Sequence, residues 1–251
     1  MSYEPTCPTP PPTPGPFRIE AVVICDQYHD FLRHTLPQNK FLFDRIVVVT
    51  SFEDKKTQRI CEYFHVECIT SDVMESRKKH FRKGAGINEG LAALSKADWV
   101  VHLDADIQLP PQTRILLERA NLDKKMLYGI DRFLVKGPKA WDEFQNMPRL
   151  QHELDCYVHM NAFHLGTRVM QPNAQGYIPI GFFQMWNPKV SGVEKYPEGH
   201  TDAGREDGMF TLRWSRAERA LIPEIIGYHL ESDDARNASN WSGRTTAPFT
   251  L

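Results

Sequence analysis

Near the middle of the chain, an apolar run leads directly into two acidic residues, in the sequence Trp99-Val100-Val101-His102-Leu103-Asp104-Ala105-Asp106. Successive Val and Leu residues favour a β-strand that is buried on both faces, as in a parallel sheet. In an extended chain, side chains at i and i+2 project to the same side, so Asp104 and Asp106 are expected to lie close together. A hard divalent cation, Mg²⁺ or Mn²⁺, would relieve their repulsion and take its other ligands from substrate phosphates.

The residues before this strand alternate between apolar runs and helical patterns. Strands are expected at 19–25, 46–50 and 66–70, and helices at 53–64 and 84–96. Ser51 to Asp54 fits a capping box that opens the first helix. Strands and helices in this order predict a Rossmann-like α/β/α sandwich with a mostly parallel central sheet and right-handed crossovers. Ligands bind beyond the carboxyl ends of the strands in such sheets.

The second half of the chain has a less regular pattern. Strands are expected at 126–130, 177–186 and 222–228, with helices near 142–156 and 207–220. Residues 1–16 are rich in proline, which predicts a disordered leader or, alternatively, a ligand for a proline-reading partner. The remainder, 17–251, is expected to be one domain, with a phosphate-binding half at 17–110 and a second half at 111–251.

Composition excludes several classes of protein. The chain has 251 residues, with 30 Lys and Arg against 32 Asp and Glu, so it has no overall basic field to hold nucleic acid. Its mean hydropathy is −0.46 and it has no long apolar run, so no membrane span is expected. The first residues do not resemble a secretory signal, which predicts a cytoplasmic protein.

A longer pattern resembles a known family. The sequence Lys83-Gly84-Ala85-Gly86-Ile87-Asn88-Glu89-Gly90-Leu91, followed by the strand and the Asp104-Ala105-Asp106 motif, is similar to the nucleotide-binding half of GT-A fold glycosyltransferases, especially family 2. The resemblance covers about residues 19–110. It implies a single GT-A domain whose D-x-D motif holds Mn²⁺ or Mg²⁺ on the diphosphate of a nucleotide sugar. It also implies transfer of the sugar, from UDP or GDP, to the hydroxyl of a glycan or another acceptor.

An acidic segment near residue 206 is similar to one that precedes a helix in inverting family members. The resemblance implies that Asp207 is the general base for the acceptor hydroxyl, while Glu206 orients the acceptor or serves as the alternative base. A base is required because an alcohol is a poor nucleophile at neutral pH. Alternatively, both acidic residues only favour the N-terminus of a helix through its dipole.

His229 follows a second apolar run, in the sequence Gly227-Tyr228-His229-Leu230-Glu231. In several metal-dependent GT-A enzymes a late histidine completes the metal shell, and the resemblance implies that His229 joins Asp104 and Asp106. A structural histidine is the alternative.

The resemblance also implies residues that bind the two substrates. The expected donor contacts are Thr50, Asp72, Lys83, Asn88 and Asp104. Lys83 ends a basic run, Arg77 to Lys83, that suits a diphosphate at a helix start or, alternatively, a nucleic acid.

In GT-A enzymes, segments similar to the aromatic, glycine-bearing stretch 177–186 line the acceptor side; alternatively, its alternating apolar residues belong to the core. The expected acceptor contacts there are Gln184 and Trp186. The polar segment 232–246 is expected to be either a lid over the donor or a mobile tail.

Three other functions stay open from the sequence. They are a nucleotidyltransferase on a related sheet, a sugar transferase that acts on nucleic acid, and an inactive module that binds sugar nucleotides. The sequence does not identify the sugar, the nucleotide, the acceptor or the oligomeric state.

Overall fold

The computed structural model describes residues 17–73, 81–94, 98–146, 167–169, 172–173, 176–199, 203, 205–232 and 244–250. Its strands are β1 Ile19–Ile24, β2 Arg45–Ser51, β3 Glu67–Ser71, β4 Trp99–Asp104, β5 Ile107–Gln108, β6 Leu127–Lys136, β7 Thr167–Val169, β8 Pro172–Asn173, β9 Gly176–Tyr177, β10 Phe183–Trp186 and β11 Arg219–Glu231. Its helices are α1 His29–Asn39, α2 Lys55–Tyr63, α3 Lys83–Ala93, α4 Thr113–Arg119, α5 Pro138–Gln145, α8 Pro188–Ser191 and α9 Glu206–Thr211, with a 3₁₀ turn at Arg216–Glu218.

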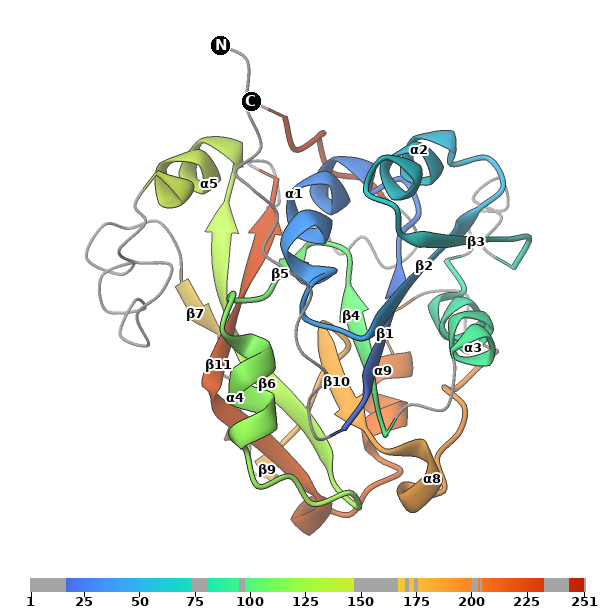
Figure 1. Cartoon of the computed structure of the whole chain (residues 1–251), viewed down its shortest axis with the longest axis vertical. Helices are drawn as coiled ribbons and strands as arrows, with labels where there is room; N and C mark the ends of the chain where they lie inside the picture. Colours follow the sequence, from blue (N-terminus) through green and yellow to red (C-terminus); the bar gives the residue numbers. More distant parts are fainter. Residues whose placement is uncertain are drawn as a thin grey trace.

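One sheet of nine strands forms the centre of the described part of the molecule (Figure 1). Its order is β3-β2-β1-β4-β10-β6-β11-β5, and β7 pairs with β6 beside this path. The four strands β3, β2, β1 and β4 are parallel, whereas β10 runs antiparallel to both β4 and β6. The expected α/β/α fold with a parallel half is therefore confirmed, and a single antiparallel strand joins that half to the parallel pair β6 and β11.

The strands bury both faces because alternate side chains point in opposite directions. Ala21, Val23 and Val48 belong to one apolar cluster, which includes residues of α1, α2 and α4. Val22 and Val49 point the other way, into a second cluster with residues of α3 and α9. Helices therefore cover both faces of the parallel half, which explains the nearly continuous apolar runs of its strands.

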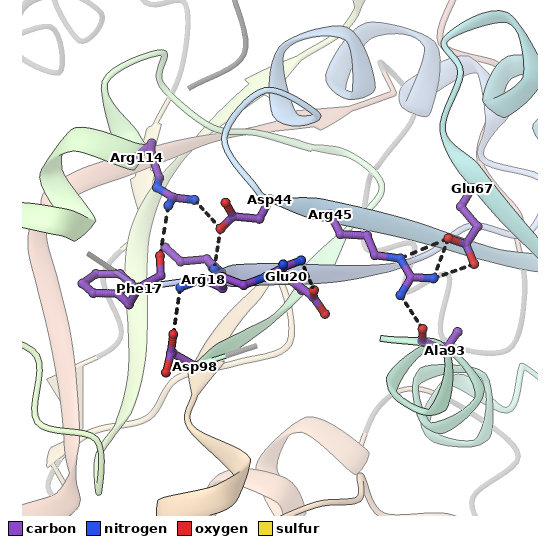
Figure 2. Close-up of polar contacts among 10 residues, drawn as sticks. Phe17, Arg18, Glu20, Asp44, Arg45, Glu67, Ala93, Asp98 and Arg114 are labelled. Atoms are coloured by element: carbon purple, nitrogen blue, oxygen red, sulfur yellow. Dashed lines mark hydrogen bonds and ion pairs between the residues drawn. The ribbon is translucent and has the colours of Figure 1, made fainter. Parts of the chain in front are cut away.

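Arginine side chains bind residues at the amino ends of the parallel strands (Figure 2). Asp104 lies at the other end, as the last residue of β4. Arg114 of α4 donates to the carboxylate of Asp44 and to the carbonyl of Phe17. Arg45 donates to Glu67 on the neighbouring strand and to the carbonyl of Ala93 at the end of α3. These contacts hold α4 and α3, which lie on opposite faces of the sheet, against the amino ends of the strands.

The structure corrects several expected boundaries. The segment between the first two strands is the helix α1, and α2 begins after Asp54, whose carboxylate accepts from the amide of Thr57. The expected capping box at Ser51 does not form, because Ser51 ends β2 and its hydroxyl donates to Asp26.

The predicted helix at 207–220 is wrong beyond Thr211. β11 begins at Arg219, which pairs with Leu127 of β6, so residues with a helical pattern form a strand because β6 supplies a partner. β11 is also longer than expected, and its register shifts between Leu221 and Ile226 around Pro223. Pro223 has no amide hydrogen, which suits such an irregularity.

Two other expected elements change. The expected strand 177–186 is divided between β9 and β10 by residues 178–182. The helix expected near 142–156 corresponds in part to α5, which begins earlier, at Pro138. Residues 147–156 of that prediction lie outside the described ranges, and so does the expected leader at 1–16.

Candidate active site

Asp104 is the last residue of β4, and its side chain reaches the first residue of α3. The ammonium nitrogen of Lys83 lies 2.8 Å from Oδ1 of Asp104. Burial raises the pKa of Asp104 to about 6; the Lys83 charge lowers it, and Asp106 and Asp207 raise it further. Burial therefore favours a proton on Asp104, and the Lys83 ammonium opposes this effect.

Lys83 is buried, although it carries a charge. Burial alone would lower its pKa, but the carboxylates of Asp104 and Asp207 hold the pKa above its usual value. Its Nζ lies 3.6 Å from Oδ1 of Asp207. The site therefore contains a permanently charged ammonium that joins carboxylates of β4 and α9.

Asp106 lies beside His229, the two residues that the resemblance implies as metal ligands together with Asp104. The distance from Nε2 of His229 to Oδ2 of Asp106 is 3.4 Å. β11 presents His229 at this point because it pairs with Ile107 of β5 and because the amide of Leu230 donates to the carbonyl of Asp106. Burial raises the pKa of Asp106, but His229 and Arg132 offset this and leave the pKa below its usual value.

The set Asp104, Asp106 and His229 has the chemistry of a manganese or magnesium site. Oδ1 of Asp106 is buried and accepts no hydrogen bond in the described part of the chain. Such an orphaned oxygen is costly unless a cation or another donor satisfies it. Among the described residues, no group of three acidic, histidine or cysteine side chains is arranged so that it could hold a metal ion. The donor types fit a hard cation that takes further ligands from a substrate.

Asp207 lies at the start of α9 and keeps about a quarter of its side chain exposed (23%). Its Oδ1 accepts a hydrogen bond of 2.7 Å from the hydroxyl of Tyr196. A Cβ at Gly181 would lie 2.1 Å from Oδ2 of Asp207, so the carboxylate rests directly on the backbone before β10. Asp207 is thus accessible, yet it is held from two sides.

Glu206 has a different environment from Asp207. Its side chain is fully buried, and its Oε2 accepts from the amide of Gly84 at 2.6 Å. Gly84 has no room for a side chain, because a Cβ there would lie 1.9 Å from the carbonyl oxygen of Pro197. Glu206 therefore ties α9 to the first turn of α3, and the structure corrects its expected contact with the acceptor.

Two expected donor contacts are engaged elsewhere. Asn88 donates to the carbonyl of Tyr196 and to Glu198, and its Oδ1 accepts from the amide of Tyr196. Thr50 is fully buried, with its hydroxyl directed at Asp54. Asp72 is exposed just after β3, where the donor role stays a prediction.

Both expected acceptor contacts lie in the core. Trp186 is fully buried in the second cluster, and its indole N–H donates to the carbonyl of Val193. Gln184 is also fully buried and donates to the carbonyl of Pro179 and to Thr211. Neither side chain has a free surface for an acceptor, because β10 is a central strand that is covered on both faces.

Sequence reasoning missed Tyr196 and Asp26. Asp26 lies two residues after the end of β1, and it is buried at the point where Ser51 ends β2. Burial raises its pKa to about 6, although the Ser51 hydroxyl lowers it. An acidic residue after an apolar run is the signal that identified Asp104, and it was available for Asp26 too. No local pattern marks Tyr196, which lies outside the regular elements.

The C-terminal segment is described from residue 244. Arg244 forms an ion pair with the buried Asp30 of α1, and its guanidinium lies 5.1 Å from the ring centroids of both Tyr28 and Phe31. It also donates to the carbonyl of Gln27 at 2.8 Å. Residues 233–243, on which the expected lid depends, lie outside the described ranges, as does most of the basic run before Lys83.

Comparison with protein families matches the description "Glycosyl transferase family 2" over residues 25–182, which is more than half of the chain. The chain belongs to glycosyl transferase family 2. The match includes β4 and the Asp104 and Asp106 pair. A search of curated proteins gave no match. Among the described residues, no helix has the length and apolarity that a membrane crossing requires.

Solved structures with similar folds are glycosyltransferases. The crystal structure of GalNAc-T7 with UDP, GalNAc and Mn²⁺ has a TM-score of 0.57 and 12% identity; the match covers 89% of this chain and 46% of that chain. Glucosyl-3-phosphoglycerate synthase from Mycobacterium tuberculosis, with Mn²⁺, UDP-glucose and phosphoglyceric acid, has a TM-score of 0.47 and 16% identity, and the match covers 85% of this chain and 72% of that chain. The first likeness supports the GT-A fold for this family 2 chain.

Proposed function

We propose that the chain is a metal-dependent glycosyltransferase that moves a sugar from a nucleoside diphosphate to an acceptor hydroxyl. One observation carries the proposal. A single buried ammonium, Lys83, lies between the carboxylate at the end of β4 and the carboxylate at the start of α9. In this arrangement the Lys83 ammonium, which can bind phosphate, contacts both the Asp104 carboxylate and Asp207, the candidate base.

On the donor side, Asp104, Asp106 and His229 would hold Mn²⁺ or Mg²⁺. When bound, the metal supplies charge neutralisation for the leaving diphosphate. Lys83 remains charged at every working pH, so it adds a second positive group for the same phosphates. The solved structure of GalNAc-T7 contains UDP and Mn²⁺, which supports a donor and cofactor of this class.

On the acceptor side, Asp207 keeps 23% of its side chain exposed, and its contacts with Tyr196 and Lys83 are both made by Oδ1. It would take the proton of the acceptor hydroxyl as the acceptor oxygen bonds to the anomeric carbon. The bond from that carbon to the diphosphate oxygen breaks, and the nucleoside diphosphate leaves with the electron pair. Direct displacement of this kind inverts the anomeric configuration. The burial of Glu206 against Gly84 favours Asp207 over Glu206 as the base.

Membership of family 2 favours sugar transfer over nucleotidyl transfer. The two reactions release different products, nucleoside diphosphate or pyrophosphate. A nucleic acid acceptor and an inactive binding module are further outcomes of the same assay. The cytoplasmic location, too, is a prediction from the sequence, and cell fractionation tests it.

The decisive experiment combines donor screening with product identification. The full chain is incubated with a panel of UDP- and GDP-sugars and Mn²⁺, and released nucleotide and pyrophosphate are measured separately. Asp207→Asn should retain donor binding and lose transfer by about 10²- to 10⁴-fold. Asp142→Asn, on the exposed face of α5, is the matched control. Release of pyrophosphate, or undiminished transfer by Asp207→Asn, would contradict the proposal.

A further inference from the structure

The hydroxyl of Tyr196 has one proton and two acceptors within hydrogen-bond distance. It lies 2.7 Å from Oε1 of Gln184 and 2.7 Å from Oδ1 of Asp207. Burial, followed by the charge of Asp207, raises the pKa of Tyr196 well above its usual value, so the hydroxyl keeps its proton. A hydroxyl donates only one hydrogen bond at a time. At any moment one of the two oxygens therefore receives no proton from Tyr196, although Lys83 lies 3.6 Å from Oδ1 of Asp207 and the His102 side chain contacts that of Gln184.

The orientation of the Gln184 amide is fixed by its other contacts. Its Nε2 donates to the carbonyls of Pro179 at 2.9 Å and Asp207 at 3.3 Å, and to the Thr211 hydroxyl at 3.0 Å. Thr211 donates its own proton to Pro179, so it can accept from Gln184. A flipped amide would direct its oxygen at two carbonyl oxygens. Oε1 of Gln184 must therefore face Tyr196 as an acceptor.

Contacts of its backbone and ring hold Tyr196 in this position. Asn88 of α3 binds both the amide and the carbonyl of Tyr196, and the Tyr196 ring stacks on Phe210 at 4.3 Å between centroids. Its side chain is 2% exposed. The other charged or titratable groups around the pair are Lys83 of α3, His102 and Asp104 of β4, and Glu206 of α9. Burial lowers the pKa of His102, which keeps that ring neutral beside Tyr196.

We propose that Tyr196 is a positioning residue that turns its proton between Asp207 and Gln184 as Asp207 loses and gains a proton. While Asp207 is ionised, the hydroxyl donates to Oδ1 and holds the carboxylate in place. Once Asp207 has taken the proton of the acceptor, the Tyr196 hydroxyl turns and donates to Oε1 of Gln184. Tyr196 keeps its proton throughout, so no other reactant is needed. The proposal rests on the proposed role of Asp207 as the base.

The two partners of Tyr196 predict opposite effects on the pH dependence of transfer. Tyr196→Phe removes the donor that stabilises the ionised form, so the acidic limb of the kcat profile should move to higher pH by about one unit. Gln184→Met removes the competing acceptor, so that limb should move to lower pH. In both variants the KM of the donor should change less than kcat. Tyr128→Phe, which also loses a buried hydroxyl but lies away from Asp207, is the control and should leave the limb in place.

A direct titration separates this proposal from the proposed function. Protein labelled with ¹³C at the Asp carboxyl carbons is titrated without any donor, and the Asp207→Asn spectrum identifies the Asp207 resonance. The same opposite shifts of its midpoint are expected even if no sugar is transferred. If Tyr196→Phe does not fold, the downward shift in Gln184→Met is still required. Shifts in the same direction, or no shift in Gln184→Met, would overturn the role of Tyr196.

Discussion

Lys83 and Asp104 form a 2.8 Å ion pair between the first residue of α3 and the last residue of β4. Parallel strands end, and the helices that cross between them begin, at the same edge of the sheet, which is why residues of these two elements meet there. The Lys83 side chain is 6% exposed and that of Asp104 is 30% exposed. The ammonium is therefore anchored inside the protein, while part of the carboxylate remains exposed.

Lys83→Met is expected to weaken donor binding. Loss of a charge-assisted contact to phosphate costs about 1.5–3 kcal/mol, or roughly 10- to 100-fold in affinity. Calorimetric titration with UDP and Mn²⁺ measures the change. Lys139→Met, at an exposed lysine of α5, is the control. Unchanged UDP affinity in Lys83→Met would remove Lys83 from the donor site.

Asp106→Asn should weaken the response to metal more than it weakens folding. The amide lacks the charge that a hard cation requires, so the Mn²⁺ concentration for half-maximal UDP binding should rise by at least about tenfold. Titration of Mn²⁺ at fixed UDP, after treatment with a chelator, gives this value. An unaltered Mn²⁺ requirement would show that the metal is held elsewhere.

Gly181→Ala should disable Asp207 without disrupting the sheet. The new methyl group would lie 2.1 Å from Oδ2, so the carboxylate must move off the backbone. Transfer should fall by at least about 10²-fold, as for loss of the base itself. Gly208→Ala is a sensitive control on the adjacent helix, because a Cβ there meets nothing within 4 Å and alanine favours a helix. Equal activity of the two variants would contradict the placement of Asp207.

Asp26→Asn should stabilise the fold near pH 7. The folded protein binds the Asp26 proton more tightly than the unfolded chain, since the pKa rises from 3.8 to about 6. Stability from this group is therefore full below about pH 4 and is lost as the pH rises through 6. The variant avoids this loss, on the order of 2 kcal/mol at pH 7. Urea unfolding at pH 4 and pH 7 should reveal a gain only at the higher pH, whereas an equal gain at both would contradict the cause given.

Arg244→Met should destabilise the chain strongly. Asp30 is 6% exposed, and removal of its partner leaves an unpaired buried charge at a cost of about 3–5 kcal/mol. Burial raises the pKa of Asp30, but Arg244 and the Phe249 amide offset this and leave the pKa below its usual value. The stability that the Arg244–Asp30 ion pair contributes is therefore present above about pH 4 and is lost as the pH falls. Arg45→Met, whose ion pair with Glu67 is more exposed, should cost less than about 1 kcal/mol of ion-pair energy. Thermal unfolding measures the loss of stability in both variants. Equal losses would contradict the larger contribution assigned to the buried Arg244–Asp30 pair.

The fold and the acidic pair could be predicted because both follow from short-range patterns. Apolar runs mark strands that are covered on both faces, and a carboxylate at the end of such a run must reach the ligand edge of the sheet. The family resemblance is confirmed on the same residues, whereas the individual site roles remain proposals. Their geometry brings Lys83, Asp104 and Asp207 together, and Asp106 next to His229.

The supporting side chains could not be predicted because their partners are remote in sequence. The family resemblance implied that Asn88 and Gln184 contact the substrates. Both instead bind Tyr196, which lies 108 residues from Asn88 and has no sequence signature. The helix predicted after Asp207 failed for a similar reason, since β6 supplies a strand partner that no local pattern reveals.

The Arg244 contact also constrains the order in which the polypeptide becomes native. Asp30 leaves the ribosome long before Arg244 and Phe249 are synthesised, yet both are needed to neutralise and cover it. During translation, α1 therefore carries an uncompensated charge next to an apolar surface. Nascent chains stalled before Arg244 should be cleaved by protease near Asp30, and chains extended past Phe249 should resist.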